Sequence, residues 1–218
     1  MRVVIVGAGG HGQVVADALA SAARLGADTE PIGFVDDNPS LAGYTLLGLP
    51  VLGQIDSLPQ IAHDGVIVAI GDNAIRRSVF NKLAARTERF AVARHPSAIV
   101  ADSVEIGRGT MICAGAIINP GTVIGANVIL NTRCSIDHHN RIGDHVHIAP
   151  GVCTGGDVRV DVGVLVGIGA VVMPGRTIRA GSTVGAGALV QQDVLEGTVV
   201  VGVPARPVRS NQFTGGRA

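Results

Sequence analysis

The sequence predicts two folds in series: a small α/β domain of the Rossmann-like half type over residues 1–95, followed by an all-β parallel β-helix over residues 96–218. Three observations predict this. A glycine-rich turn joins a short apolar strand to a helical segment near the amino terminus, and an aliphatic residue recurs every six positions over the second half. With 31 Gly, four Phe, one Tyr and no Trp, only small aliphatic side chains are available to fill a narrow core.

The amino-terminal segment reads as strand, turn and helix. Residues 3–6 form a short apolar strand, residues 7–12 (GAGGHG) a glycine-rich turn, and residues 13–23 a helix with one apolar side. Further strands are expected at residues 32–35, ending in Asp36-Asp37, and at residues 66–70, ending in Gly71-Asp72-Asn73 before a helix over residues 74–86. Polar groups at the carboxyl ends of strands lie where ligands bind in an open α/β sheet.

The glycine turn predicts a phosphate-bearing ligand. Glycines let the backbone approach a pyrophosphate, the helix amino terminus favours negative charge, and Asp36 follows at the distance that ribose recognition requires. NAD would need two βαβαβ halves, whereas about one half precedes the repeats, so a nucleotide sugar fits better. NAD binding and a purely structural turn remain alternatives, and an aspartate here can also cap the next turn. The residues expected to bind substrate are Gly9, Gly10, His11, Gly12, Asp36, Asp37 and Asn73.

The six-residue period is unbroken across the second half. Only Thr154 departs from the aliphatic rule, and a glycine often follows the aliphatic residue, where a Cβ would crowd the backbone or φ must turn positive. Short strands therefore coil into a parallel β-helix with stacked aliphatic side chains. The positions are Val100, Ile106, Ile112, Ile118, Ile124, Leu130, Ile136, Ile142, Ile148, Thr154, Val160, Val166, Val172, Ile178, Val184 and Val190.

Four histidines stand within ten residues of the repeat region: His138, His139, His145 and His147. Imidazole titrates near neutral pH and can take a proton from an attacking amine or hydroxyl, so the cluster indicates a general base. One or two of the four are expected to be solvated or structural corner residues. The three cysteines, Cys113, Cys134 and Cys153, lack metal-type spacing and are read as small buried or corner thiols rather than acyl carriers.

Charge and hydropathy limit the classes of partner that the protein is expected to bind. The formal net charge is +0 and the pI about 7.1, which gives no case for nucleic acid or an anionic membrane. No apolar run reaches membrane-spanning length, and the amino terminus lacks secretory features, so a soluble cytoplasmic protein is expected. Small molecules and copies of the same chain are the expected partners.

Several segments in this order resemble a known family. They are GAGGHG, Phe34-Val35-Asp36-Asp37, Ile70-Gly71-Asp72-Asn73 with Arg76, Ile129-Leu130-Asn131-Thr132 leading into Asp137-His138, and Val201-Gly202-Val203-Pro204-Ala205. Together they resemble the NeuD/PglD-type sugar acetyltransferases over nearly the whole chain. The resemblance implies a left-handed β-helix, a homotrimer, and acetyl-CoA bound in the groove between adjacent β-helices.

The resemblance also implies roles for single residues. His138 matches the catalytic base, Asn131 a polar residue close to it, and His147 a histidine near the acetyl group. Gly156 and Gly185 match backbone contacts along the CoA groove, and the Gly156 N–H is the leading candidate to bind the oxyanion. Members of the bacillosamine type have Glu after the base, where this chain has His139, which leaves Asp137 as a possible carboxylate partner.

The function expected from this resemblance is direct acetyl transfer to the 4-amino group of a UDP- or GDP-linked deoxy-amino sugar, with no metal required. Sialic-acid O-acetylation is the alternative within the family. A metal-dependent γ-type carbonic anhydrase is a more distant one, because histidines of neighbouring subunits can hold a zinc-like ion. A third alternative is a non-catalytic β-helix that serves as a binding module or a scaffold. The nucleotide base, the sugar and the choice between N- and O-acetylation are not determined by the sequence.

Overall fold

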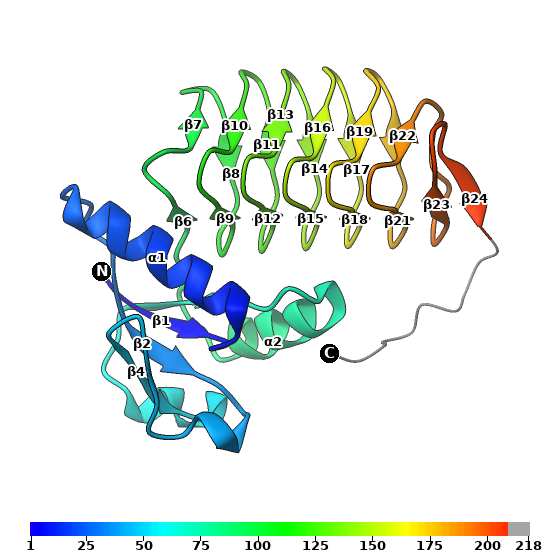
Figure 1. Ribbon diagram of the computed structural model, residues 1–218. Coiled ribbons are helices and arrows are strands. Elements are labelled where there is room, and N and C mark those ends of the chain that lie inside the picture. The colour runs from blue at the N-terminus through cyan, green and yellow to red at the C-terminus, as the bar shows by residue number, and fades with distance from the viewer. Residues whose placement is uncertain (209–218) are drawn as a thin grey trace.

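A computed structural model of the protein describes residues 1–208 and shows an α/β domain beside a β-helix (Figure 1). Residues 209–218, the end of the predicted second domain, lie outside the described residues. Within residues 1–208, neither α-helix combines the length and apolarity needed to cross a bilayer. The predicted fold class, an α/β amino-terminal part followed by a β-helix, is confirmed.

The amino-terminal domain is a five-stranded sheet in the order β3-β4-β2-β1-β5. Strands β4, β2, β1 and β5 are parallel, and β3 is an antiparallel edge strand on β4. The β3–β4 hairpin was not predicted, because its short strands are interrupted by glycine and proline. The elements are β1 (Arg2–Val6), α1 (Gly10–Arg24), β2 (Glu30–Val35), η1 (Pro39–Leu41), β3 (Thr45–Leu46), β4 (Leu49–Gly53), η2 (Ile55–Gln60), β5 (Gly65–Val68) and α2 (Asn73–Ala85).

The glycine turn lies at the point where the strand order reverses. The chain passes from β1 to β2 on one side and later crosses to β5 on the other, so a ligand crevice opens at the carboxyl end of β1. Gly7 there has a φ of +106°. A Cβ on Gly12 would lie 2.0 Å from the Gly7 carbonyl oxygen, so these two glycines fold the turn against α1.

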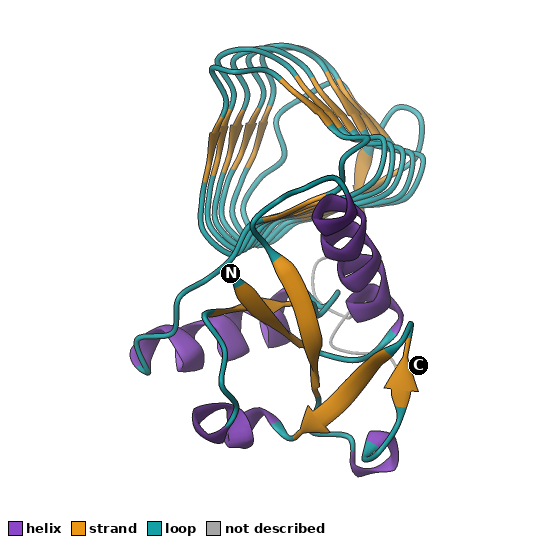
Figure 2. Cartoon of the chain, turned by 90° about the vertical axis from the view of Figure 1, so that its left-hand side faces the viewer, coloured by secondary structure: helices purple, strands orange, loops and turns teal. Residues whose placement is uncertain are grey.

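The second domain is a triangular coil, seen end-on in Figure 2. Its two-residue strands pair in parallel with the strand eighteen residues later, as Ile117 pairs with Ser135. Three strands therefore make one coil. Strand β23 (Val199–Val201) and the antiparallel β24 (Arg206–Val208) close the carboxyl end.

Each side of the coil is named here for its surroundings. The docked sheet faces the amino-terminal domain and contains β6 (Ala93–Arg94), β9 (Met111–Ile112), β12 (Ile129–Leu130), β15 (His147–Ile148), β18 (Leu165–Val166), β21 (Thr183–Val184), β23 and β24. The bare sheet contains β7 (Ile99–Val100), β10 (Ile117–Ile118), β13 (Ser135–Ile136), β16 (Cys153–Thr154), β19 (Val171–Val172) and β22 (Leu189–Val190). The arginine sheet contains β8 (Glu105–Ile106), β11 (Val123–Ile124), β14 (Arg141–Ile142), β17 (Arg159–Val160) and β20 (Thr177–Ile178).

The second residue of each two-residue strand from β7 to β22 is a member of the predicted aliphatic column. These side chains point inward and are buried from Ile112 to Val190, whereas Val100 and Ile106, near the first coil, are half-buried. Thr154 is also buried, and its Oγ1 accepts a hydrogen bond from the Asp137 N–H at 3.3 Å. The one polar member of the column thus has its oxygen satisfied by the neighbouring coil.

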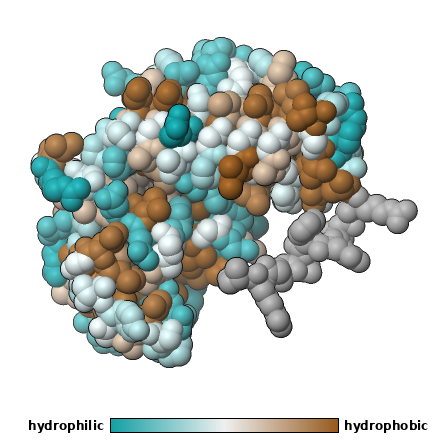
Figure 3. All heavy atoms as spheres, viewed as in Figure 1, coloured by the Kyte–Doolittle hydropathy of each residue, from teal (hydrophilic) through white to brown (hydrophobic). Residues whose placement is uncertain are grey.

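The first residue of each strand points outward, and the three sheets differ in what they present there. The bare sheet presents apolar groups to solvent, including Ile99 (65% exposed), Ile117 (37%) and Val171 (42%), with Ser135 and Cys153 between them. Figure 3 shows brown apolar patches along this part of the surface. The arginine sheet instead presents Arg141 and Arg159, paired in register.

The corners explain why glycine recurs. A Cβ on Gly107 would lie 2.4 Å from the Gly125 carbonyl carbon of the next coil, so the glycine after the aliphatic residue is required by close approach. Positive φ occurs two residues further on, for example at Gly109 (72°). Two reasons were predicted for these glycines. Crowding explains the glycine directly after the aliphatic residue, such as Gly107, and positive φ explains the glycine two residues later, such as Gly109.

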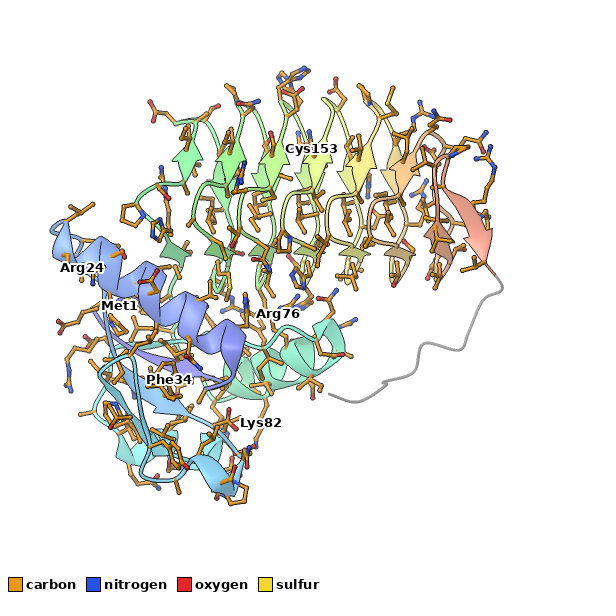
Figure 4. All side chains as sticks on the ribbon, in the orientation of Figure 1. Met1, Arg24, Phe34, Arg76, Lys82 and Cys153 are labelled. Carbon is orange, nitrogen blue, oxygen red and sulfur yellow. The ribbon has the colours of Figure 1, made fainter. Side chains whose placement is uncertain are left out.

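Arg76 joins the two domains. Helix α1 and one face of the amino-terminal sheet share a buried cluster with Met111 and Ile129 of the docked sheet. On α2, the Arg76 side chain is 1% exposed and lies between that helix and the β-helix (Figure 4). Its guanidinium donates to main-chain oxygens of Ile70, Gly71, Asn127, His145 and Val146 and to Asn73 Oδ1.

Replacing Arg76 with Met should destabilise the protein by about 3–5 kcal/mol, because it leaves several buried carbonyl oxygens without donors. Denaturant unfolding followed by circular dichroism measures the change. Arg77→Met is the matched control, since Arg77 is exposed on the same helix and should change stability by less than about 0.5 kcal/mol. Equal effects of the two substitutions would contradict the role of Arg76 as the buried joint.

Candidate active site

The predicted site residues fall into two groups, beside two different corners of the β-helix. The first group lies where the docked sheet turns toward the bare sheet, beside the amino-terminal domain. It borders a pocket with a volume of about 890 Å³, whose walls include Gly71, Asn73, Asn131, His147 and Gly167. Gly185 follows β21, next to the pocket residues Thr183 and Ala186, so it lies on the same side.

His147 has both ring nitrogens engaged. Nδ1 lies 3.3 Å from the Gly71 carbonyl oxygen, which can only accept, so Nδ1 carries the proton. Nε2 is then an acceptor for the Asn131 Nδ2 donor at 3.2 Å, and Asn131 Oδ1 accepts from the Thr132 N–H. Burial, followed by the Arg76 charge and His11, lowers the pKa of His147 to about 4. His147 is therefore neutral at pH 7.

His11 lies beside His147, with the ring centroids 6.3 Å apart. Its Nε2 is buried and has no hydrogen-bond partner among residues 1–208. Burial, followed by the Arg76 charge, lowers the pKa of His11 to about 4. Gly9 and Gly10 precede it, and a Cβ on either would meet nothing within 4 Å. Open space thus adjoins Gly9 and Gly10, while Gly12 packs against Gly7.

Asp36, Asp37 and Asn73 hold the chain around this crevice. Asp36 accepts from the Ala8 N–H at 2.7 Å and the Asn38 N–H at 2.9 Å, and Asp37 accepts from the Ile55 N–H at 2.9 Å. Asn73 Nδ2 donates to the carbonyl oxygens of Gly163 and Val164, both at 3.1 Å. The aspartates organise the strand ends, and Asn73 ties the start of α2 to the β-helix.

The second group lies where the bare sheet turns toward the arginine sheet. His138 is exposed there, and its Nδ1 lies 3.0 Å from Nδ1 of His139. A Cβ on Gly156 would lie 2.3 Å from Cε1 of His138 and 2.5 Å from Nε2, so the imidazole covers this glycine. The Gly156 N–H donates to no acceptor within residues 1–208. An imidazole and a free N–H donor therefore adjoin at one corner.

Within residues 1–208, Asp137 makes no hydrogen bond to the ring of His138. Its Oδ1 accepts from Asn119 Nδ2 at 3.0 Å and from the backbone N–H of His138 at 2.8 Å. These bonds, that from Asn119 first, lower the pKa of Asp137. Sequence reasoning missed Asn119, although it stands eighteen residues before Asp137 and therefore at the same corner position of the preceding coil. It also gave Arg76 no role, although the pocket loop depends on it.

The four clustered histidines do not converge within one protomer. His145 packs its ring against Phe80, and its Nδ1 accepts from Asn127 Nδ2 at 2.8 Å, so it belongs to the joint between the domains. His147 faces the pocket, and His138 and His139 share the other corner. Within residues 1–208, no three His, Cys, Asp or Glu side chains are grouped as metal ligands would be.

The chain is similar to known proteins along nearly its whole length. The PglD N-terminal domain family matches residues 2–83. The acetyltransferase domain of PglB from Neisseria gonorrhoeae FA1090 is 34% identical, with a TM-score of 0.87 over 95% of this chain and 99% of that one. PerB from Caulobacter crescentus, solved with CoA and GDP-perosamine, is 35% identical, with a TM-score of 0.89 over 96% and 98% of the two chains.

A curated relative matches a smaller part of the chain. UDP-N-acetylbacillosamine N-acetyltransferase from Bacillus subtilis (strain 168) is 37% identical over 119 residues, which are 52% of this chain and 51% of that protein. The match therefore spans about half the length of the relative. The repeat architecture, with imidazoles at its corners, and these likenesses define a hexapeptide-repeat acyltransferase. The chain belongs to the NeuD/PglD-type family of sugar acetyltransferases.

The stability of the protein should fall as the pH is lowered from 6.5 toward 4. His11 and His147 have folded-state pKa values of about 4, below the ordinary 6.5, so the unfolded chain takes up protons first. Their contribution is complete above pH 6.5 and is lost as the pH falls. It amounts to at most about 3 kcal/mol for each group.

Denaturant unfolding at several pH values measures this dependence in the native protein and in His147→Gln, which cannot protonate at that position. The variant should lose less stability than the native protein between pH 6.5 and 4. Parallel pH curves for the two proteins would show that His147 is not held neutral by the fold.

Proposed function

We propose that the protein transfers the acetyl group of acetyl-CoA to the 4-amino group of a UDP- or GDP-linked deoxy-amino sugar. The observation that carries this proposal is the exposed imidazole of His138 beside the free N–H of Gly156, in a chain related over nearly its whole length to PerB and PglB. The relatives named for bacillosamine and perosamine support N-acetylation.

In the proposed reaction, the unprotonated sugar amine attacks the thioester carbonyl while Nε2 of His138 accepts the proton it loses. The N–H of Gly156 donates to the oxygen on which negative charge develops. The tetrahedral intermediate then expels the CoA thiolate, which can take the proton held on Nε2. His147 and Asn131, both uncharged, would orient the reacting groups.

The nucleotide part of the substrate is assigned to the glycine turn. The open space at Gly9 and Gly10 and the amino terminus of α1 suit a diphosphate, because backbone N–H groups and the helix dipole favour negative charge. His11 would offer Nε2, which has no partner within the described residues, to the sugar or a phosphate. Donor and acceptor of this kind are met in the cytoplasm, where we expect the protein to act.

The two site corners require a second copy of the chain. Within one protomer the bare sheet separates His138 from Asn131 and His147, and its outer face is apolar and exposed. Burying this face against another copy removes apolar area from water and brings the His138 corner of one protomer toward the pocket corner of the next. A three-fold arrangement repeats that contact identically, so a homotrimer with shared sites is proposed.

The first test is CoA release with a panel of UDP-, GDP- and dTDP-linked 4-amino sugars, with free sialic acid as a further acceptor. Native protein should prefer one 4-amino sugar, and His138→Ala should lower kcat by about 10²–10⁴-fold, the usual contribution of a general base. His95→Ala, which lies two coils before Asn131 and does not line the pocket, should keep full turnover. Near-native turnover of His138→Ala, or release with sialic acid alone, would overturn the proposal.

The second test asks whether sites are shared between protomers. His138→Ala and Asn131→Ala homotrimers should each be nearly inactive, whereas mixed trimers formed after dissociation and reassembly should regain about a quarter of native activity, because one site in four combines two intact halves. Val171→Lys on the bare sheet should yield smaller species in sedimentation experiments. Mixed samples no more active than their parents would place both halves of the site in one protomer.

A further inference from the structure

We propose that His139 is the positioning partner of His138, so that the base of this enzyme is held by a second histidine instead of a carboxylate. The inference rests on the proposed function for the role of His138 itself. The geometry that points to it is the 3.0 Å separation of the two Nδ1 atoms, with the rings edge to face and their centroids 5.2 Å apart.

The coils on either side fix both rings. His138 lies over Gly156 of the following coil, and His139 lies over Gly121 of the preceding one, where a Cβ would come 2.6 Å from Cδ2 of His139. The backbone is fixed as well, because His139 N–H donates to the Pro120 carbonyl oxygen and His138 carbonyl oxygen accepts from Asp157 N–H, both at 3.0 Å. The pair is therefore clamped between two glycines and two coil-to-coil bonds.

A hydrogen bond between two Nδ1 atoms admits one proton. If His139 donates, the remaining proton of neutral His138 sits on Nε2, and the atom that should accept from the amine is blocked. If His138 donates, its Nε2 carries the free lone pair, and His139 keeps its own proton on Nε2. During the reaction Nε2 of His138 gains the amine proton, while its Nδ1–H stays in place and points at the lone pair of His139.

The nearby carboxylates do not replace this partner. The charged groups around the pair are Asp137 on its own coil and Asp157 on the next, while the preceding coil presents Pro120 and Gly121. Asp137 accepts hydrogen bonds from Asn119 Nδ2 and from the His138 backbone N–H. Within residues 1–208, neither carboxylate is hydrogen-bonded to either imidazole ring. A neutral acceptor stabilises the imidazolium formed during the reaction less than a carboxylate would.

The backbone of His139 has a conformation that residues with a side chain seldom adopt. Its φ is +57°, in the left-handed region that glycine occupies at most equivalent corners, including Gly115, Gly121 and Gly151. A side chain there costs about 1 kcal/mol relative to an unstrained conformation. Asn127, Arg133, His145 and Asp157 share this conformation, so the positive φ belongs to the corner and can be used to design a variant.

This backbone geometry provides a clean variant. His139→Gly removes the imidazole while suiting the positive φ, so the fold should persist with nearly unchanged stability. Its kcat should fall about 10–100-fold with the KM for acetyl-CoA changed less than about twofold, since orientation and not binding is lost. Arg133→Gly is the matched control, because Arg133 is exposed at the preceding corner with the same φ of 57° and should keep native kcat.

The pH profile and rescue separate positioning from a merely structural role. His139→Glu supplies a carboxylate acceptor and should restore much of the kcat lost in His139→Gly. Because a carboxylate stabilises an imidazolium more than a neutral imidazole does, the acidic limb of the kcat/KM profile of this variant should lie at higher pH than that of the native enzyme. Native kcat in His139→Gly, or a His139→Glu profile with its acidic limb unmoved, would falsify the proposal.

A titration followed by NMR tests the pair without relying on turnover. The chain has seven histidines, so the Cε1–H signals of His138 and His139 can be assigned by single substitution. Removing either ring should change the titration curve of the other, as expected for coupled sites. Unchanged curves would refute the pairing. If the native protein instead acetylated no amino sugar while the curves remained coupled, the proposed function would fail and the pair would stand.

Discussion

The eighteen-residue repeat of the coil is the constraint on which the rest of the structure depends. Successive coils approach so closely at the corners that Gly107 and its equivalents leave no room for a Cβ, and backbone bonds then fix every corner against the next. The inward column of Val, Ile and Leu stabilises this arrangement by burial. Side chains at the corners consequently stand in columns along the prism, and the residues proposed for catalysis lie along two of its edges.

The two columns differ in electrostatic character. At the pocket, burial and the Arg76 charge keep His11 and His147 neutral, so they act there as oriented dipoles and hydrogen-bonding groups. At the other corner, His138 is exposed and its Nδ1 is paired with Nδ1 of His139, which leaves Nε2 of His138 available to a substrate. This division suits a reaction in which one imidazole must change charge while its surroundings do not, and the apolar bare sheet offers the surface that would bring the columns together.

The fold could be predicted from the sequence because its signals are local and repeated. The aliphatic period located the inward residue of every strand from Val100 to Val190, and the glycine turn located β1 and α1. The β3–β4 hairpin was missed, since two- and five-residue strands with an internal proline carry no periodic signal. The resemblance named His138 and His147, but spacing alone could not reveal that a whole side of the prism separates them within one protomer, or that Asp137 bonds to Asn119 and not to the imidazole.

The joint between the domains combines a buried apolar cluster, which includes Met111 and Ile129, with hydrogen bonds from one guanidinium to main-chain oxygens. In the coil, the guanidinium of Arg76 donates to the main-chain oxygens of Asn127, His145 and Val146. These bonds do not depend on which side chains stand at those positions. Side chains at these corner positions can therefore change without removing the oxygens that Arg76 binds. In an evolving lineage, this separates the freedom to accept a new sugar from the requirement to keep the two halves aligned, which Arg76 meets together with the buried apolar cluster.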